Sequence, residues 1–317
     1  MAYVGIDLAW NDRARTGLAV LDADGALTAS GSVGSDAEID DWLARHVAHG
    51  REIIAVDAPL VVTNETGQRD CERLVTSVYG RYDAGCHSSN RSMSYMNPPR
   101  AERLAQRHGW EVDPGSTARP LCLEVYPHAA MVGLFELGRT LKYKKGSIET
   151  RRPALAEVVD RIEGLDNLKL RESRRWQEIV EIVTAASRPA DINRVEDEVD
   201  AILCAHLAWL WDIDAAALHV YGSAAAGYIV APPPPTHAPA PRPRTTRPPA
   251  THAAAVMPGG NKEPISEESI GFTVDGTPVS FATSGEAAWR AAVGQAARPA
   301  RDGRSPILGR TDLLPPA

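Results

Sequence analysis

The chain of 317 residues contains few of the features that mark secreted or membrane proteins. It has four cysteines (Cys71, Cys86, Cys122 and Cys204), and no two of them have CxxC spacing. This pattern favours reduced thiols and matches no common zinc site. No apolar stretch approaches the roughly 20 residues of a membrane span, and the N-terminus lacks the basic region of a secretory signal. We therefore expect a cytoplasmic protein that does not bind membranes.

Aromatic residues are also scarce, at 6% of the chain, with only three phenylalanines. The hydrophobic content of 44% still allows a sizeable core, which must consist mainly of aliphatic side chains and alanine. The net charge of −7 argues against a generic nucleic-acid coat protein, which would be basic overall. A nuclease remains compatible with this charge, because its metal site adds acids while a local basic patch holds the phosphate backbone.

The first predicted strand covers residues 3–10 and is almost wholly apolar except for Asp7. Two further apolar runs, residues 16–21 and 27–33, flank the turn signal at residues 22–25. These three runs predict an antiparallel three-stranded meander. They also place a single carboxylate near the end of a buried strand, where it is costly unless it is paired or holds a metal.

Two later strands show the same pattern of an apolar run that ends on one acid. Residues 53–60 contain Asp57 and residues 121–127 contain Glu124, each shortly before a proline. A helix that begins at Ser35 separates the meander from the strand with Asp57. A crossover of this length implies that this strand pairs in parallel with the first one.

The remaining elements surround this predicted sheet. Residues 61–117 look like a helical insertion over its active-site end, with helices at 68–78 and 98–108. The strongest helix signal covers residues 194–211, where three- and four-residue spacing places Asp197 and Asp200 on the apolar face. Dipole complementarity explains acids in the first turn, but not two acids on the face that packs against the sheet.

Five carboxylates could therefore converge at one edge of the sheet: Asp7, Asp57, Glu124, Asp197 and Asp200. Two carboxylates about 4 Å apart repel by roughly 4 kcal/mol at an effective dielectric constant of 20. A larger cluster needs divalent cations, and hard oxygen ligands suit Mg²⁺ or Mn²⁺. Two such ions can clamp the attacking and leaving oxygens of a phosphodiester. The alternative for Asp7 is a cap on the turn that follows it.

Several short motifs resemble the DUF429 family of predicted RNase H-like nucleases, and the resemblance covers residues 1–232. The motifs are Val4-Gly5-Ile6-Asp7, Val56-Asp57-Ala58-Pro59, Glu124-Val125-Tyr126-Pro127, Lys145-Gly146 with Arg151, Asp200-Ala201 and Gly227-Tyr228-Ile229-Val230. The resemblance implies an α/β fold with an RNase H-like mixed five-stranded sheet flanked by helices. For a metal-dependent phosphodiesterase, we expect Asp7, Asp57 and Asp200 to be metal ligands, and Glu124 and Asp197 to be further ligands or the base that orients water.

Basic residues near this site are candidates for holding the substrate. Arg69 and Arg73 match a basic cluster of the family, and residues 139–176 contain 11 Lys and Arg against 6 Asp and Glu. Lys144, Lys145 and Arg151 lie in that stretch and could contact a phosphate backbone. The alternative interpretation is a solvated helix face.

We expect an RNase H-like nuclease-type domain over residues 1–231, a proline-rich linker over 232–264 and a small hairpin-helix module over 265–317. The predicted function is metal-dependent hydrolysis of phosphodiesters in DNA, RNA or a nucleotide. The alternative is a module of the same fold that binds a nucleotide or nucleic acid without cleaving it. A sugar-kinase-like phosphotransferase is disfavoured, because the turn at residues 22–25 is too short and too acidic for a phosphate loop.

Overall fold

The computed structural model describes residues 1–241 except 12–13 and 49, together with two short strands at 272–274 and 277–279. The chain divides into two compact units, Met1–Thr245 and Thr246–Ala317, which are described separately.

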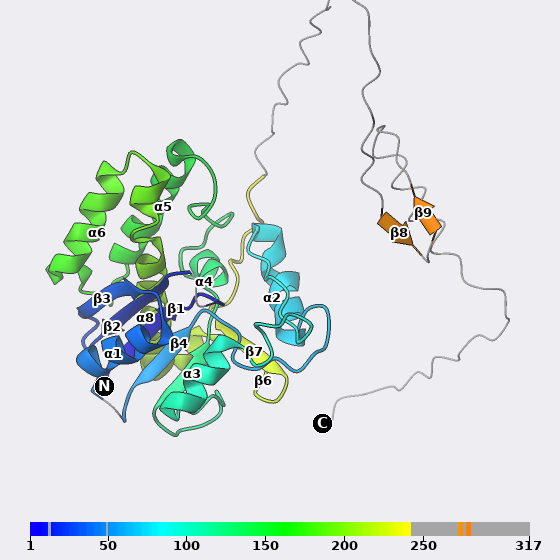
Figure 1. The fold of residues 1–317 in the computed structure, drawn as a ribbon. Helices are drawn as coiled ribbons and strands as arrows, with labels where there is room; N and C mark the ends of the chain where they lie inside the picture. The colour runs from blue at the N-terminus through cyan, green and yellow to red at the C-terminus, as the bar shows by residue number, and fades with distance from the viewer. Residues whose placement is uncertain (12–13, 49, 242–271, 275–276, 280–317) are drawn as a thin grey trace, which may run out of the picture. The chain divides into compact units, whose positions relative to one another are not determined.

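A five-stranded mixed sheet forms the centre of the first unit, in the order β3-β2-β1-β4-β5 (Figure 1). Its strands are β1 (Tyr3–Asp7), β2 (Thr16–Leu21), β3 (Leu27–Val33), β4 (Ile53–Val56) and β5 (Leu121–Glu124). The first three strands form an antiparallel meander, whereas β4 pairs in parallel with both β1 and β5. This arrangement confirms the predicted α/β fold and its mixed sheet.

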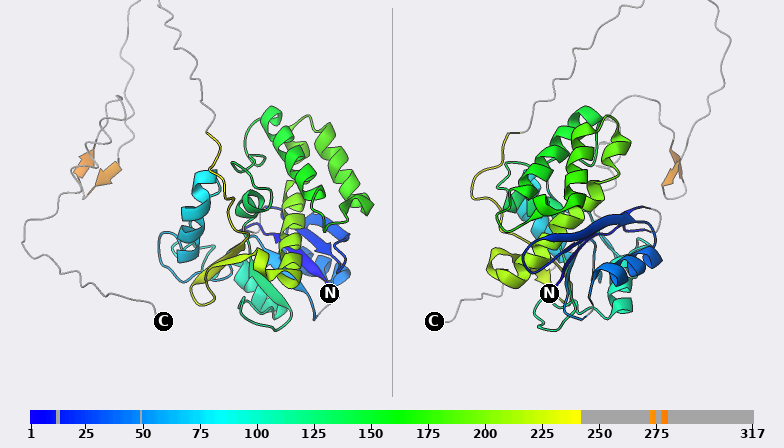
Figure 2. Two further views of the ribbon diagram at one scale, coloured as in Figure 1. Left: turned by 180° about the vertical axis from the view of Figure 1, so that it is seen from behind. Right: turned by 90° about the vertical axis from the view of Figure 1, so that its left-hand side faces the viewer.

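Helices cover both faces of the sheet. Their bounds are α1 (Asp36–His46), α2 (Asp70–Tyr79), α3 (Arg100–His108), α4 (Pro127–Leu134), α5 (Ile148–Glu163), α6 (Arg174–Ala185), α7 (Pro189–Ile192) and α8 (Glu196–Ile213). Figure 2 shows α5, α6 and α8 on one face and α1 with α3 on the other. Strands β1, β2 and β4 are therefore buried throughout, as their continuous apolar runs predict.

Helix α8 packs unusually close to the sheet because glycines face it. A Cβ atom added to Gly5 of β1 would lie 1.8 Å from the carbonyl oxygen of Ala201, and one added to Gly17 of β2 would lie equally close to that of Asp197. Only glycine permits these approaches. They bring the first turns of α8, which carry Asp197 and Asp200, directly over β1, which ends at Asp7, and over Gly17, the β2 residue that pairs with Asp7.

The prediction of helix α1 is confirmed in detail. Ser35 caps the helix, its hydroxyl accepts a hydrogen bond from the amide of Glu38, and the Glu38 carboxylate accepts one from the amide of Ser35. Helices α2, α3 and α8 also form where the sequence predicts them, with ends that differ by one or two residues. Among the described residues, no helix is both long and apolar enough to span a membrane.

A second, two-stranded sheet consists of β6 (His219–Ser223) and β7 (Gly227–Ala231). Strand β7 contains the Gly227-Tyr228-Ile229-Val230 motif and is buried throughout, whereas β6 is mostly exposed. A bridge between Val125 and Val230 places β7 next to the end of β5.

The segment after β7 differs from the expected linker. The hydroxyl of Tyr82 donates a hydrogen bond of 2.7 Å to the carbonyl of His237, and the amide of Ala240 donates one of 2.9 Å to the carbonyl of Gly138. Tyr79 likewise donates to the carbonyl of Pro232. These hydrogen bonds therefore tie residues 232–241 to the first unit.

The second unit contains the predicted hairpin. Strand β8 (Phe272–Val274) pairs antiparallel with β9 (Thr277–Val279) on either side of Asp275-Gly276. The helix expected in the module of residues 265–317 lies outside the described residues.

Candidate active site at the ends of β1 and β4

Three of the predicted acids come together where β1 and β4 end. Asp7 is the last residue of β1, and Asp57 directly follows β4, where its amide donates a 2.8 Å hydrogen bond to the carbonyl of Ile6. Asp200 reaches the same place from the second turn of α8 and is completely buried. The parallel pairing of β1 and β4 therefore positions two carboxylates, and the close packing of α8 positions the third.

A lysine lies between two of these carboxylates. The Lys144 Nζ atom lies 2.6 Å from Oδ2 of Asp200 and 3.1 Å from Oδ2 of Asp7. The neighbouring hydroxyl of Tyr143 donates a 2.5 Å hydrogen bond to Oδ1 of Asp200. One ammonium group thus joins the end of β1 to the start of α8.

The acids remain crowded despite this lysine. Burial, reinforced by Asp200 and Asp197, raises the pKa of Asp7 to about 7, although Lys144 opposes the shift. Burial and the Asp7 carboxylate raise the pKa of Asp57 well above its usual range. Burial also raises the pKa of the half-buried Asp197 to about 6. The folded chain therefore favours the neutral forms of Asp7, Asp57 and Asp197 at pH values where a free aspartate is ionised.

Glu124, the fifth predicted acid, has a different partner. Its carboxylate accepts two hydrogen bonds from the guanidinium of Arg69, at 2.9 and 2.5 Å, and another from the amide of Leu60. Arg69 also pairs with the buried Glu72. Glu124 is close enough to affect the pKa of Asp57, but its oxygens already accept hydrogen bonds from protein donors. The structure therefore places it beside the other acids, within its own ion pair.

Only part of the predicted substrate-binding set faces solvent. Arg73 is exposed, where it pairs with Asp70, and Lys145 is exposed as well. Lys144 and Arg69, in contrast, are engaged with the acids described above. The prediction that all of them contact a phosphate backbone therefore does not fit their positions in the structure.

Arg151, the remaining candidate, is buried and supports the loop that carries the lysine. Its Nε atom donates to the carbonyl of Tyr143 at 2.6 Å, and its Nη2 atom contacts Asn193 and Glu196 at 2.8 and 2.6 Å. Several other arginines of the basic stretch form ion pairs: Arg161 with Glu157, Arg171 with Glu163, and Arg175 with Glu198. Much of the positive charge of this stretch is therefore paired with acids of the same fold.

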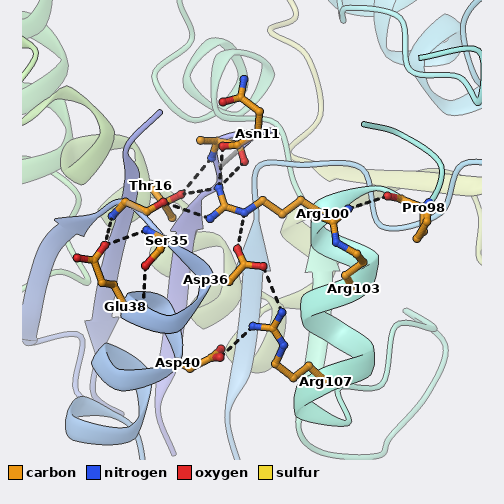
Figure 3. Close-up of polar contacts among 12 residues, drawn as sticks. Asn11, Thr16, Ser35, Asp36, Glu38, Asp40, Pro98, Arg100, Arg103 and Arg107 are labelled. Atoms are coloured by element: carbon orange, nitrogen blue, oxygen red, sulfur yellow. Dashed lines mark hydrogen bonds and ion pairs between the residues drawn. The ribbon is translucent and has the colours of Figure 1, made fainter. Parts of the chain in front are cut away.

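The loop that follows Asp7 is fixed by a buried arginine of α3. The Arg100 Nη1 atom donates to the carbonyls of Ala9 and Asn11, at 2.9 and 3.1 Å, while its Nε atom pairs with Asp36 at 2.6 Å (Figure 3). Arg107, about two turns further along α3, contacts the other oxygen of Asp36. These contacts join the helical insertion to the end of β1.

Sequence analysis missed Tyr143 and Arg100 as site residues. Each contacts a partner more than 50 residues away in the chain, and neither belongs to a local motif. A small cavity of about 40 Å³ also lies beside the acids and is lined in part by Trp10, Asp57 and Tyr126. Its volume is sufficient for one or two water molecules.

The acids of the site offer the hard oxygen ligands that a divalent cation prefers, but in this structure they are not arranged at coordination distance around one point. Carboxylate oxygens of Asp7 and Asp200 already converge on one cationic atom, Lys144 Nζ. Mg²⁺ requires oxygen ligands at about 2.0–2.1 Å, which is shorter than both Nζ–oxygen distances, so the two carboxylates would have to adjust to hold it. Within the described ranges, no three His, Cys, Asp or Glu side chains are grouped tightly enough to hold a metal ion.

Comparison with known proteins identifies the family. No curated protein and no solved structure matches the chain. The family described as "Protein of unknown function (DUF429)" matches residues 5–225, which include Asp7, Asp57 and Asp200. The chain therefore belongs to the DUF429 family.

Proposed function

We propose that this protein is a metal-dependent hydrolase of phosphodiester bonds, acting on DNA, RNA or a nucleotide through an RNase H-like domain. The observation that carries the proposal is the convergence of Asp7, Asp57 and Asp200 from β1, β4 and α8. Burial, together with neighbouring carboxylates, raises the pKa values of Asp7 and Asp57, so keeping these acids ionised in the folded chain costs free energy. Such a cluster is consistent with a cation site, since a hard divalent cation would relieve the repulsion.

In this proposal Asp7, Asp57 and Asp200 are the metal-binding residues. Bound Mg²⁺ or Mn²⁺ would supply charge for stabilising the attacking and leaving oxygens of a phosphodiester. Asp197 is half-buried at the start of α8, where its carboxylate is suited to orient a water molecule. Glu124 acts indirectly, because it lies near Asp57 while Arg69 holds its orientation.

The exposed cations are the candidates for substrate contact. Lys145 follows Lys144 directly on the loop beside the acids, and Arg73 lies exposed on α2. A phosphate backbone bound by them would show a salt-dependent affinity, with a slope that falls by about one unit for each contact removed. The Lys145→Ala variant tests this contribution without disturbing a buried ion pair.

The proposal is tested with a panel of labelled single-stranded, double-stranded and branched DNA and RNA substrates, and with small nucleotides. Each substrate is incubated with Mg²⁺, with Mn²⁺ or with EDTA. We expect cleavage only with a divalent cation, and loss of cleavage by roughly two orders of magnitude or more in Asp7→Asn and Asp200→Asn. The matched control is Asp214→Asn, an exposed acid after the last residue of α8, which should retain activity. Cleavage that persists in EDTA or in both site variants would overturn the proposal.

A second candidate function is binding without cleavage, and the position of Lys144 favours it. An ammonium between Asp7 and Asp200 lets the folded chain tolerate these acids without a metal. The same panel separates the two functions, because a binding module would retain substrate in EDTA and release no product with any cation.

A further inference from the structure

Lys144 stands at the point where two carboxylates of the site converge. Its Nζ atom contacts Oδ2 of Asp200 at 2.6 Å and Oδ2 of Asp7 at 3.1 Å. Oδ2 of Asp200 is fully buried, and it has an ion pair with this lysine but no hydrogen bond of good geometry. The ammonium therefore neutralises charge without filling the coordination of that oxygen.

The side chain of Lys144 has a route to solvent, whereas its backbone is anchored. About a third of the side chain is exposed (32%), in contrast to the buried side chain of Asp200. The backbone just before it is held by the hydrogen bond from Arg151 to the carbonyl of Tyr143. The long side chain can therefore swing outward by rotation about its own bonds, without movement of the loop.

We infer that Lys144 is an exchangeable counter-ion, which occupies the position of a divalent cation between Asp7 and Asp200 and must withdraw when that cation binds. This inference rests on the proposed metal-dependent function. An ammonium and a divalent cation cannot share the same two oxygens, because their charges would repel at a separation of a few ångströms. The exchange also accounts for the distances from Nζ to the two oxygens, which fit an ammonium and are longer than an Mg²⁺–oxygen bond of about 2.0–2.1 Å.

The inference predicts that Lys144 lowers metal affinity. A cation that binds must first displace the lysine, so removing the lysine removes a competitor. The lysine also stabilises the metal-free fold, because it is the cation paired with both acids in the described part of the chain. Lys144 would thus keep the protein folded without metal and set the concentration at which metal enters.

The first experiment measures Mn²⁺ binding to wild type, Lys144→Met and Lys145→Met by electron paramagnetic resonance. Lys145→Met is the matched control, because it removes the same charge from the exposed neighbouring position. We expect Lys144→Met to bind Mn²⁺ about tenfold more tightly than wild type or better. The control should stay within about threefold of wild type, since exposed charges are screened by solvent and salt. Equal or weaker binding by Lys144→Met would overturn the inference.

A second experiment uses the wild-type protein and does not require the variant to fold. The protein is treated briefly with an amine-acetylating reagent, with and without Mn²⁺, and the extent of acetylation at Lys144 and Lys145 is read by mass spectrometry. Metal should raise acetylation of Lys144 several-fold relative to Lys145, because the ammonium moves from the acids into solvent. An unchanged ratio at saturating Mn²⁺ would contradict the exchange.

The two proposals fail in different ways. If Lys144→Met binds Mn²⁺ tightly and wild type does not bind it, the lysine and the cation compete for the same position between Asp7 and Asp200. The same result would contradict a metal-dependent function of the natural chain. Metal-dependent cleavage by wild type, with no gain in affinity on removal of Lys144, would support the function and overturn the exchange.

Discussion

Arg69 and Glu124 form a buried bidentate ion pair although they lie 55 residues apart in the chain. The pair joins the start of α2 to the end of β5, and Glu72 also contacts the same guanidinium. Because charge-assisted, bidentate hydrogen bonds are strong and directional, the pair fixes how the helical insertion lies on the sheet.

The first prediction concerns this pair. Arg69→Met should destabilise the fold by about 3–5 kcal/mol, since it leaves the buried carboxylates of Glu124 and Glu72 without their cation. Glu124→Gln should cost less, because Arg69 retains Glu72. Denaturant unfolding in EDTA measures both variants. An equal or larger loss of stability for Glu124→Gln would contradict this account of the pair.

The same variant separates the two roles considered for Glu124. If the carboxylate is only a neighbour of the site, Glu124→Gln should retain Mn²⁺ affinity. If Glu124 is a metal ligand, Mn²⁺ affinity should fall sharply in a protein that is still folded.

The sequence was sufficient to single out both the acids of this candidate site and the cations Lys144 and Arg69, but not to predict that these cations pair with the acids. Asp7 and Asp57 each follow a continuous apolar run, so the strand ends could be located from local pattern alone. Asp200 was identified because an acid on the apolar face of a helix is unusual. The partners, in contrast, depend on tertiary placement: Lys144 lies on a loop without periodicity, and its pairing is decided by how that loop folds over α8.

The second prediction concerns pH. The pKa of Asp7 is about 7 in the folded chain, against 3.8 for a free side chain. Folding therefore binds a proton between about pH 4 and pH 7, and the stability of the metal-free protein falls as pH rises through this window. Asp7→Asn removes that titration. At pH 8 it should be more stable than wild type by about 1–2 kcal/mol after solvent relaxation, and the difference should vanish near pH 4.

Denaturant unfolding in EDTA across this pH range tests the second prediction. The alternative, in which Asp7 only caps a turn, predicts no pH-dependent difference because asparagine caps nearly as well. If the difference in unfolding free energy between wild type and Asp7→Asn is constant from pH 4 to pH 8, the pKa of Asp7 is not raised by folding, and this account of the buried acids is contradicted.

The third prediction concerns the clamp on the loop after Asp7. Arg100→Met should destabilise the fold by about 3–5 kcal/mol, because it removes a buried cation from Asp36 and leaves backbone carbonyls unpaired. Arg107→Ala is the matched control on the same helix and shares Asp36 as its partner. Since Arg107 is substantially exposed, its loss should cost about 1 kcal/mol or less. Similar melting temperatures for the two variants would show that Arg100 does not clamp the loop.

The fourth prediction concerns the segment after β7. A chain that ends after residue 241 should melt like the first unit of the full chain, because it keeps the contacts of Tyr82 and Gly138. A chain that ends after residue 231 loses them and should melt several degrees lower, on the scale of about 2–4 °C for each kcal/mol lost. Identical melting curves would restore the interpretation of residues 232–241 as a linker. Proline content alone did not distinguish these alternatives, because an extended proline-rich segment can lie on a surface as readily as in solvent.

The central claim is that Asp7, Asp57 and Asp200 hold a divalent cation, and Mn²⁺ diffraction tests it most directly. Crystals of the protein are soaked in Mn²⁺, and anomalous differences are measured at the manganese absorption edge. The account predicts a peak within coordination distance of Asp7 and Asp200, with the Lys144 ammonium withdrawn from both. Millimolar Mn²⁺ that leaves no peak there, with the Lys144 contacts of 2.6 and 3.1 Å intact, would contradict it.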